Sequence, residues 1–70
     1  MDHSTTRALI IPDIIKKIME YYNISAMQAY DEFYTSATGD ALSDDTTGLY
    51  GQSPNYIFGL FLNEKGDLPS

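Results

Sequence analysis

Apolar residues recur along the first third of the chain with the period of an α-helix. Their spacing predicts a helix from Thr5 or Thr6 to Tyr22, with charged side chains on the opposite side. Pro12 leaves two possibilities open: it lies at the first position of a helix that starts at Ile11, or it kinks a longer helix. We expect the longer helix. The apolar positions fall at i, i+3, i+4, i+7, i+8 and i+11: Ile11, Ile14, Ile15, Ile18, Met19 and Tyr22.

A tight corner is predicted after this helix, at Asn23-Ile24-Ser25. Ser25 can cap a second helix, and Gln28 stands where a capping box needs a side chain that reaches back. Ile24, just before the cap, is placed to act as a hydrophobic staple. These signals predict that a short connection joins the two helices.

The second helix is predicted to run from Ala26 to about Ser36. We expect Thr38-Gly39 to end it, because glycine tolerates the left-handed conformation of a helix C-cap. Residues 39–53 are less regular, and a structureless loop of that length is unusual in a small domain. A short helix or helical turn is therefore expected there. Its tethers to the core are Leu42, Leu49 and Tyr50, and the inner stripe of the second helix is Ala26, Ala29 or Tyr30, Phe33 and Ala37.

The last element is framed by Ser53-Pro54, a cap followed by proline at the first helical position, and by Gly66. Residues 56–62 are apolar throughout, and their periodicity does not separate a buried strand from a buried helix. The start and stop signals favour a helix.

These elements predict one all-α domain spanning residues 1–70. We expect three main helices plus a short helical turn around one small core, arranged as an orthogonal or bundle-like array. Residues 1–4 and 67–70 are expected to be mobile tails. A chain of this length buries only about 60% of the surface that its unfolded form exposes.

The charge balance excludes several classes of partner. The chain carries ten acidic and four basic residues, for a net charge of −6. Four basic side chains are too few to follow a phosphate backbone, and an acidic chain is repelled by anionic membranes. The chain has no cysteine, no signal-peptide pattern and no apolar run of about 20 residues. We expect a cytoplasmic protein that binds neither nucleic acid nor membranes.

No constellation of residues predicts catalysis, a metal or a cofactor. Asp40, Asp44 and Asp45 form the densest acidic cluster, but neither frame of an EF-hand places glycine sixth and glutamate twelfth. We expect a solvated turn in which these side chains cap local N–H groups. His3 is the one histidine and lies in an expected tail, so no base is available to activate a nucleophile.

Aromatic side chains are the remaining signal. The chain has six tyrosines and three phenylalanines, more than three short helices readily enclose, so some rings are expected at a binding surface. The leading function is a non-enzymatic protein-interaction module whose partner is another protein or a second copy of the chain. The alternative is a small-ligand or regulatory domain with a pocket near Tyr50 and Tyr56. The candidate contact residues are Tyr34, Tyr56, Phe58, Phe61 and Leu62.

The order of segments resembles a group of small uncharacterised bacterial helical domains. Some members of that group look like partners of neighbouring toxin-like genes, so the resemblance implies a small binding protein of antitoxin-like character. The chain departs from the pattern in its Asp-rich loop and in lacking a histidine near Tyr50, and no functional residue is carried over. The matching segments are Ile14 to Tyr22, Asn23-Ile24-Ser25, Ala29-Tyr30 with Phe33, Leu49-Tyr50, and Ser53 with Tyr56-Ile57.

Overall fold

The computed structural model describes residues 4–67, and within them every regular element is helical. The all-α fold predicted from the sequence is confirmed. Of the expected tails, residues 1–3 and 68–70 lie outside the described range. The elements in chain order are α1 (Ser4–Tyr22), α2 (Ala26–Tyr34), α3 (Ala37–Ser43), the 3-10 turns η1 (Asp45–Thr47) and η2 (Leu49–Gly51), and α4 (Pro54–Lys65).

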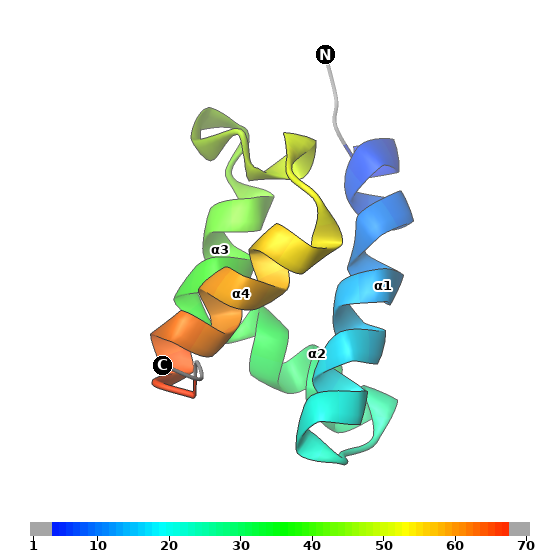
Figure 1. Ribbon diagram of the computed structural model, residues 1–70. Coiled ribbons are helices and arrows are strands. Elements are labelled where there is room, and N and C mark those ends of the chain that lie inside the picture. Colours follow the sequence, from blue (N-terminus) through cyan, green and yellow to red (C-terminus); the bar gives the residue numbers. More distant parts are fainter. Residues whose placement is uncertain (1–3, 68–70) are drawn as a thin grey trace.

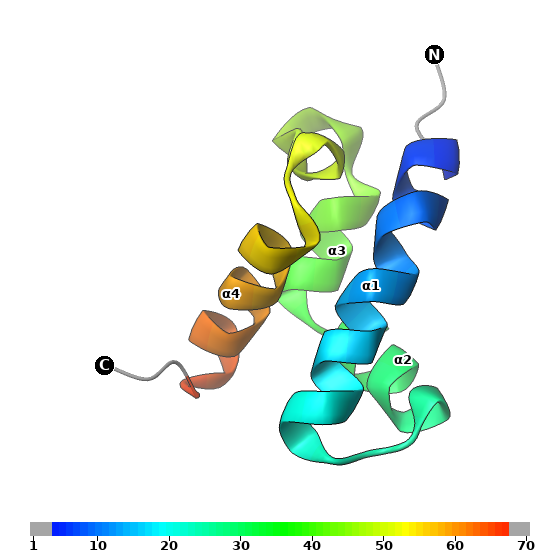
Figure 2. The same cartoon turned by 45° about the vertical axis from the view of Figure 1, so that its right-hand side comes forward.

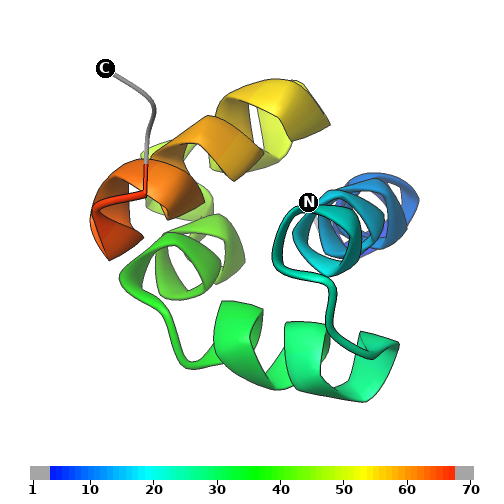
Figure 3. The ribbon, with the colours of Figure 1, turned by 60° about the horizontal axis from the view of Figure 1, so that its bottom comes forward.

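The helices surround one core (Figures 1 and 2). α1 is the longest element, and α2 folds back against its carboxyl end after the corner. α4 contacts both α1 and α3, and η2 packs against α1. Viewed from the end at which α1 meets α2, the four helices form a ring around the interior (Figure 3).

The core takes its side chains from all four helices. Phe33 of α2 and Phe61 of α4 are its largest members, with ring centres 6.1 Å apart. The longest helix supplies three buried isoleucines at the predicted spacing, which passes through Pro12 without ending the helix. The buried cluster is Ile14, Ile15, Ile18, Ala29, Phe33, Leu42, Ile57 and Phe61.

The corner between α1 and α2 forms as the sequence predicts. Asn23 adopts the left-handed conformation, with φ of 56°, and the Ile24 N–H donates to the Met19 carbonyl at 3.2 Å, as in a Schellman motif. The Ser25 hydroxyl oxygen then accepts a hydrogen bond from the Gln28 N–H at 3.2 Å. The chain therefore ends one helix and starts the next with local partners alone.

α4 also begins and ends where predicted, with Ser53 as N-cap and Gly66 as a left-handed C-cap. The apolar inner side of this helix is covered within the chain. α1 packs on one side of α4 and α3 on another, so Ile57, Phe61 and Leu62 are buried within the chain.

The junction between α2 and α3 differs from the prediction. α2 ends at Tyr34, and α3 already begins at Ala37, so Gly39 lies inside a helix and does not cap one. The physical reason is Ser36, whose hydroxyl oxygen accepts the Gly39 N–H at 3.0 Å and starts the new helix. Gly39 is needed there because a Cβ would collide with the carbonyl group of Phe33, a backbone group that cannot move aside.

The first N–H groups of α3 find their other acceptor in α4. The Glu64 carboxylate accepts hydrogen bonds from the N–H groups of Ala37 and Thr38, both at 2.8 Å, and from the Thr38 hydroxyl at 2.7 Å. A carboxylate is favoured at a helix N-terminus by both hydrogen bonding and the helix dipole. This bond set ties the carboxyl end of α4 to the start of α3.

Residues 39–53 contain most of α3 and the two 3-10 turns, which agrees with the expected short helix or helical turn. Leu42 is buried, and Leu49 and Tyr50 pack against the core while partly exposed. Asp44 caps the first turn by accepting hydrogen bonds from the Thr46 hydroxyl at 2.7 Å and from its N–H at 3.0 Å. Both hydrogen bonds hold the pKa of Asp44 below its usual value, and the bond from the Thr46 hydroxyl has the larger effect.

Two glycines within helices should respond to alanine in opposite directions. Gly39→Ala should lower the free energy of unfolding by about 1–3 kcal/mol, because the new methyl group overpacks the α2–α3 corner. Gly59→Ala, where a Cβ would meet no atom within 4 Å, should raise it by about 0.5–1 kcal/mol, since alanine is the better helix former. Urea unfolding of both variants provides the measurement. Equal effects of the two substitutions would contradict the close approach of the Phe33 carbonyl to position 39.

The Glu64 cap should be visible as a pH-dependent contribution to stability. Partial burial raises the pKa of Glu64, but the bonds from Ala37 and Thr38 outweigh this, so the pKa lies below its usual value. The stabilisation is therefore present above the unfolded pKa of about 4.3 and is lost as the pH falls through the folded value.

Glu64→Gln should cost about 1–2 kcal/mol at pH 7, because an amide cannot accept at both positions. Urea titrations at pH 7 and pH 3 should show this difference shrinking in acid. Glu20→Gln, an exposed position on α1, is the control. A difference that persists unchanged at pH 3 would show that the carboxylate charge does not matter.

Candidate functional site

The outer face of α2 carries an apolar stripe that no other described element covers. Met27 is 84% exposed, Tyr30 37% and Tyr34 50%. They are spaced i, i+3 and i+7, which places them on one side of the helix. We call Met27, Tyr30 and Tyr34 the α2 stripe.

The two rings of the stripe stack on each other. The ring centres of Tyr30 and Tyr34 are 5.9 Å apart, with 11° between their planes. Tyr34 also meets the buried Phe33 edge to face at 5.7 Å, so the pair is fixed to the core through its neighbour. The exposed Asp31 lies beside these rings on the same outward side of α2.

The structure does not bring the five predicted contact residues onto one surface. Tyr34 is in the α2 stripe, and Tyr56, 53% exposed, is on the first turn of α4. Phe58 is partly buried and meets the Tyr21 ring edge to face at 5.8 Å. The remaining two, Phe61 and Leu62, are 1% and 5% exposed because α4 is covered within the chain, so their assignment to an outer surface is wrong.

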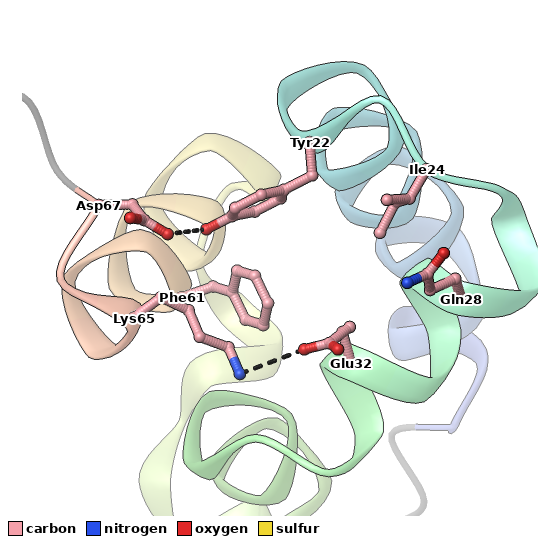
Figure 4. A pocket seen from close by; sticks show the side chains of 7 residues that line it. All are labelled: Tyr22, Ile24, Gln28, Glu32, Phe61, Lys65 and Asp67. Atoms are coloured by element: carbon pink, nitrogen blue, oxygen red, sulfur yellow. Dashed lines mark hydrogen bonds and ion pairs between the residues drawn. The ribbon is translucent and has the colours of Figure 1, made fainter.

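A second feature is a cleft at the end of the molecule where α1 turns into α2 (Figure 4). It has a volume of about 250 Å³ and lies between that corner and the last turn of α4. We call it the corner cleft. Its lining residues are Tyr22, Ile24, Gln28, Glu32, Phe61, Lys65 and Asp67.

One edge of the cleft is closed by Asp67, which the sequence placed in a mobile tail. The left-handed Gly66 turns the chain so that the Asp67 N–H donates to the Leu62 carbonyl at 2.9 Å. The Tyr21 hydroxyl donates to the Asp67 carbonyl oxygen at 2.8 Å, and the Tyr22 hydroxyl donates to its carboxylate at 2.6 Å. Asp67 is thus held by α1 and α4, two of the three helices that border the cleft.

The opposite edge holds an ion pair between α2 and α4. Lys65 Nζ lies 3.4 Å from a carboxylate oxygen of Glu32 and 5.3 Å from the centre of the Phe61 ring. Figure 4 shows the lysine running past the ring towards Glu32, with the Tyr22 ring on the same side as Phe61 and with Ile24 and Gln28 across the opening. The cleft therefore combines two carboxylates, one ammonium group and two aromatic walls.

The alternative of a ligand pocket near Tyr50 and Tyr56 is not supported by the lining of this cleft, which contains neither residue. Tyr50 instead packs against the core in η2. Among residues 4–67, no group of three or more His, Asp or Glu side chains is placed to hold a metal ion. The structure also contains, in the part that it describes, no helix long and apolar enough to cross a membrane. His3 lies outside the described residues.

Sequence reasoning missed part of each feature for different reasons. The sequence leaves open whether Ala29 or Tyr30 points inward, although the i, i+3, i+7 spacing of Met27, Tyr30 and Tyr34 indicates a second apolar face. The cleft had no such signal. Its walls come from segments more than 30 residues apart, as the Lys65–Glu32 separation of 33 shows.

The bond between Tyr22 and Asp67 predicts a stability that depends on alkaline pH. Burial and then the hydrogen bond to the Asp67 carboxylate raise the pKa of Tyr22 well above its usual value of about 10. The folded chain thus favours the protonated phenol. This contribution is fully present below about pH 10 and is lost as the pH rises towards the folded pKa.

Tyr22→Phe should cost about 0.5–1.5 kcal/mol at pH 7, the value of one hydrogen bond. Urea unfolding of wild type and variant should show the gap closing above pH 10, while Tyr56→Phe, at an exposed position, changes little at either pH. A gap that stays constant into strong alkali would contradict the bond.

Comparison of the chain with protein-family models, with curated proteins and with solved structures finds no match. The resemblance to small bacterial helical domains therefore rests on the residues quoted for it. The function has to be argued from the geometry of the two surface features described above.

Proposed function

We propose that the protein is a non-catalytic protein-interaction module that docks another protein through the α2 stripe. The observation that carries the proposal is the stacked, exposed pair of Tyr30 and Tyr34 beside the almost fully exposed Met27. Tyrosine and methionine are enriched in protein interfaces, and fully burying a methionine-sized side chain contributes about 1.5–3 kcal/mol.

The stack makes the surface ready to bind. Two rings that already lie against each other, with one braced by Phe33, lose less conformational entropy on docking than free side chains do. The rings also present flat apolar area with hydroxyl groups that remain able to bond to water or a partner. An α-helical or extended segment with apolar side chains would cover them.

Charge decides which partner fits. Asp31 stands beside the stripe, and the chain as a whole has a net charge of −6. In a two-fold dimer built on this short stripe, the two copies of Asp31 would face each other near the axis, where like charges repel. A different protein with basic residues around an apolar patch is favoured, and it would be steered by the field of the acidic chain.

A photo-crosslinking amino acid at position 27 tests the proposal in cells of the native host. It should give one discrete adduct, larger than the chain by the mass of one partner protein. The same amino acid at the exposed Asn63 of α4 should give none. Excess wild-type chain should abolish the adduct, whereas excess Tyr30→Ser/Tyr34→Ser chain of unchanged melting temperature should not.

Two outcomes would overturn the proposal. Equal adducts from positions 27 and 63 would show that the stripe is not a specific surface. An adduct of twice the chain mass, together with a dimer in sedimentation equilibrium, would show that the second copy of the chain, and not another protein, covers the stripe.

A further inference from the structure

We infer that the corner cleft is a binding site for an organic ammonium ion, which the ammonium group of Lys65 occupies from within the chain. The site is separate from the α2 stripe. Gln28 and Glu32, which line the cleft, are one turn apart on a side of α2 that the stripe residues do not share. The inference therefore stands or falls independently of the proposed function.

The present occupant shows which ligand chemistry the cleft accepts. Lys65 Nζ lies over the face of Phe61 at 5.3 Å and beside Glu32 at 3.4 Å. A cation over an aromatic face and next to a carboxylate is the arrangement by which proteins recognise ammonium groups. Figure 4 shows the rings of Tyr22 and Phe61 on the same side of the opening, with the carboxylates of Glu32 and Asp67 at its edges.

The charge in the cleft is not balanced by the lysine. Two carboxylates, those of Glu32 and Asp67, stand against one ammonium group among the lining residues. The excess is one negative charge within a chain whose net charge is −6. An anion is therefore disfavoured, and an external cation is attracted to the cleft, where it competes with the lysine for Glu32.

The lysine is held weakly enough to be displaced. Its distance of 3.4 Å from Glu32 is longer than the about 2.7–2.9 Å of a strong charged hydrogen bond. The two side chains keep 33% and 46% of their surface exposed, and ion pairs between side chains as exposed as these add little to stability. An external ammonium ion that reached Glu32 would replace Lys65 at little cost.

The size of the cleft selects a small ligand or a single side chain. Its volume of about 250 Å³ is below the range of about 300–1,000 Å³ that is usual for small-molecule sites. A short alkylammonium ion, either free or as a lysine-type side chain of another protein, has the right charge and an apolar stem that Ile24 and Phe61 can cover. The shared chemistry is a primary ammonium on an aliphatic stem.

Titration of the ¹⁵N-labelled chain with n-butylammonium chloride, followed by NMR, tests the site. Saturable shifts should centre on Glu32, Phe61 and Lys65, with a Kd in the millimolar range. 1-Butanol and sodium butyrate at equal ionic strength should give no such saturation. Butylammonium and a blocked lysine, Nα-acetyl-lysine methylamide, distinguish the sources: binding of both indicates a side-chain site, and binding of butylammonium alone indicates a free amine.

Substitutions give the decisive directions. Lys65→Gln should strengthen butylammonium binding about two- to fivefold, because the internal competitor is gone, and Glu32→Gln should weaken it by a similar factor. Lys17→Gln removes the same charge on α1, outside the cleft, and should change the Kd by less than the Lys65 variant does.

The inference is overturned if butylammonium gives no saturable shifts, if 1-butanol reproduces them, or if Lys65→Gln and Lys17→Gln strengthen binding equally. Equal strengthening by the two lysine variants would show that the change in net charge alone explains the tighter binding. Wild-type melting temperatures of the variants ensure that each result reports on the cleft.

Discussion

The start of α3 has N–H groups without acceptors inside their own helix, and it lies where α2, α3 and α4 meet. Such a helix end is costly unless other groups accept its hydrogen bonds. Ser36 provides one acceptor and Glu64, from the last turn of α4, provides the others. The Glu64 cap holds the last turn of α4 against α3, and the packing of α4 on α1 brings the residues that follow to the corner at which α1 ends. Both contacts together place Lys65 and Asp67 at the corner cleft.

Local signals predicted most element boundaries because their partners lie within a few residues. Ser25 and Ser53 each accept a hydrogen bond from an N–H three residues later, and Gly66 ends α4 in the left-handed conformation. The prediction that Gly39 ends the second helix is wrong. A glycine after a helix usually caps it, but here the close approach of the Phe33 carbonyl requires it inside the next helix. The second acceptor, Glu64, is 27 residues from Ala37, and no local pattern connects them.

The surplus of aromatic residues directed the predicted contact surface mainly to the last helix, and the fold buries two of the residues chosen there, Phe61 and Leu62. α4 is apolar nearly all round, and the sequence alone made it the candidate for an outside partner. In the fold it lies between α1 and α3, so Phe61 is core. Among the described residues, the exposed rings are shared between helices: Tyr21 is on α1, Tyr56 is on α4, and the stacked pair of Tyr30 and Tyr34 is on α2. α2 has nine residues and buries only Ala29 and Phe33. A helix that contacts the core along so narrow a line leaves the rest of its circumference to the solvent.

The short α2 consequently presents three different faces, and helical geometry keeps them apart. Ala29 and Phe33 point into the core, Glu32 borders the corner cleft, and Tyr30 and Tyr34 face outward. With 3.6 residues per turn, adjacent residues differ by about 100° around the axis, so neighbours in sequence belong to different faces. The outward face offers rings, whereas the cleft offers carboxylates and an internal cation. The two proposed sites therefore share no residue, and they differ in the chemistry that they offer.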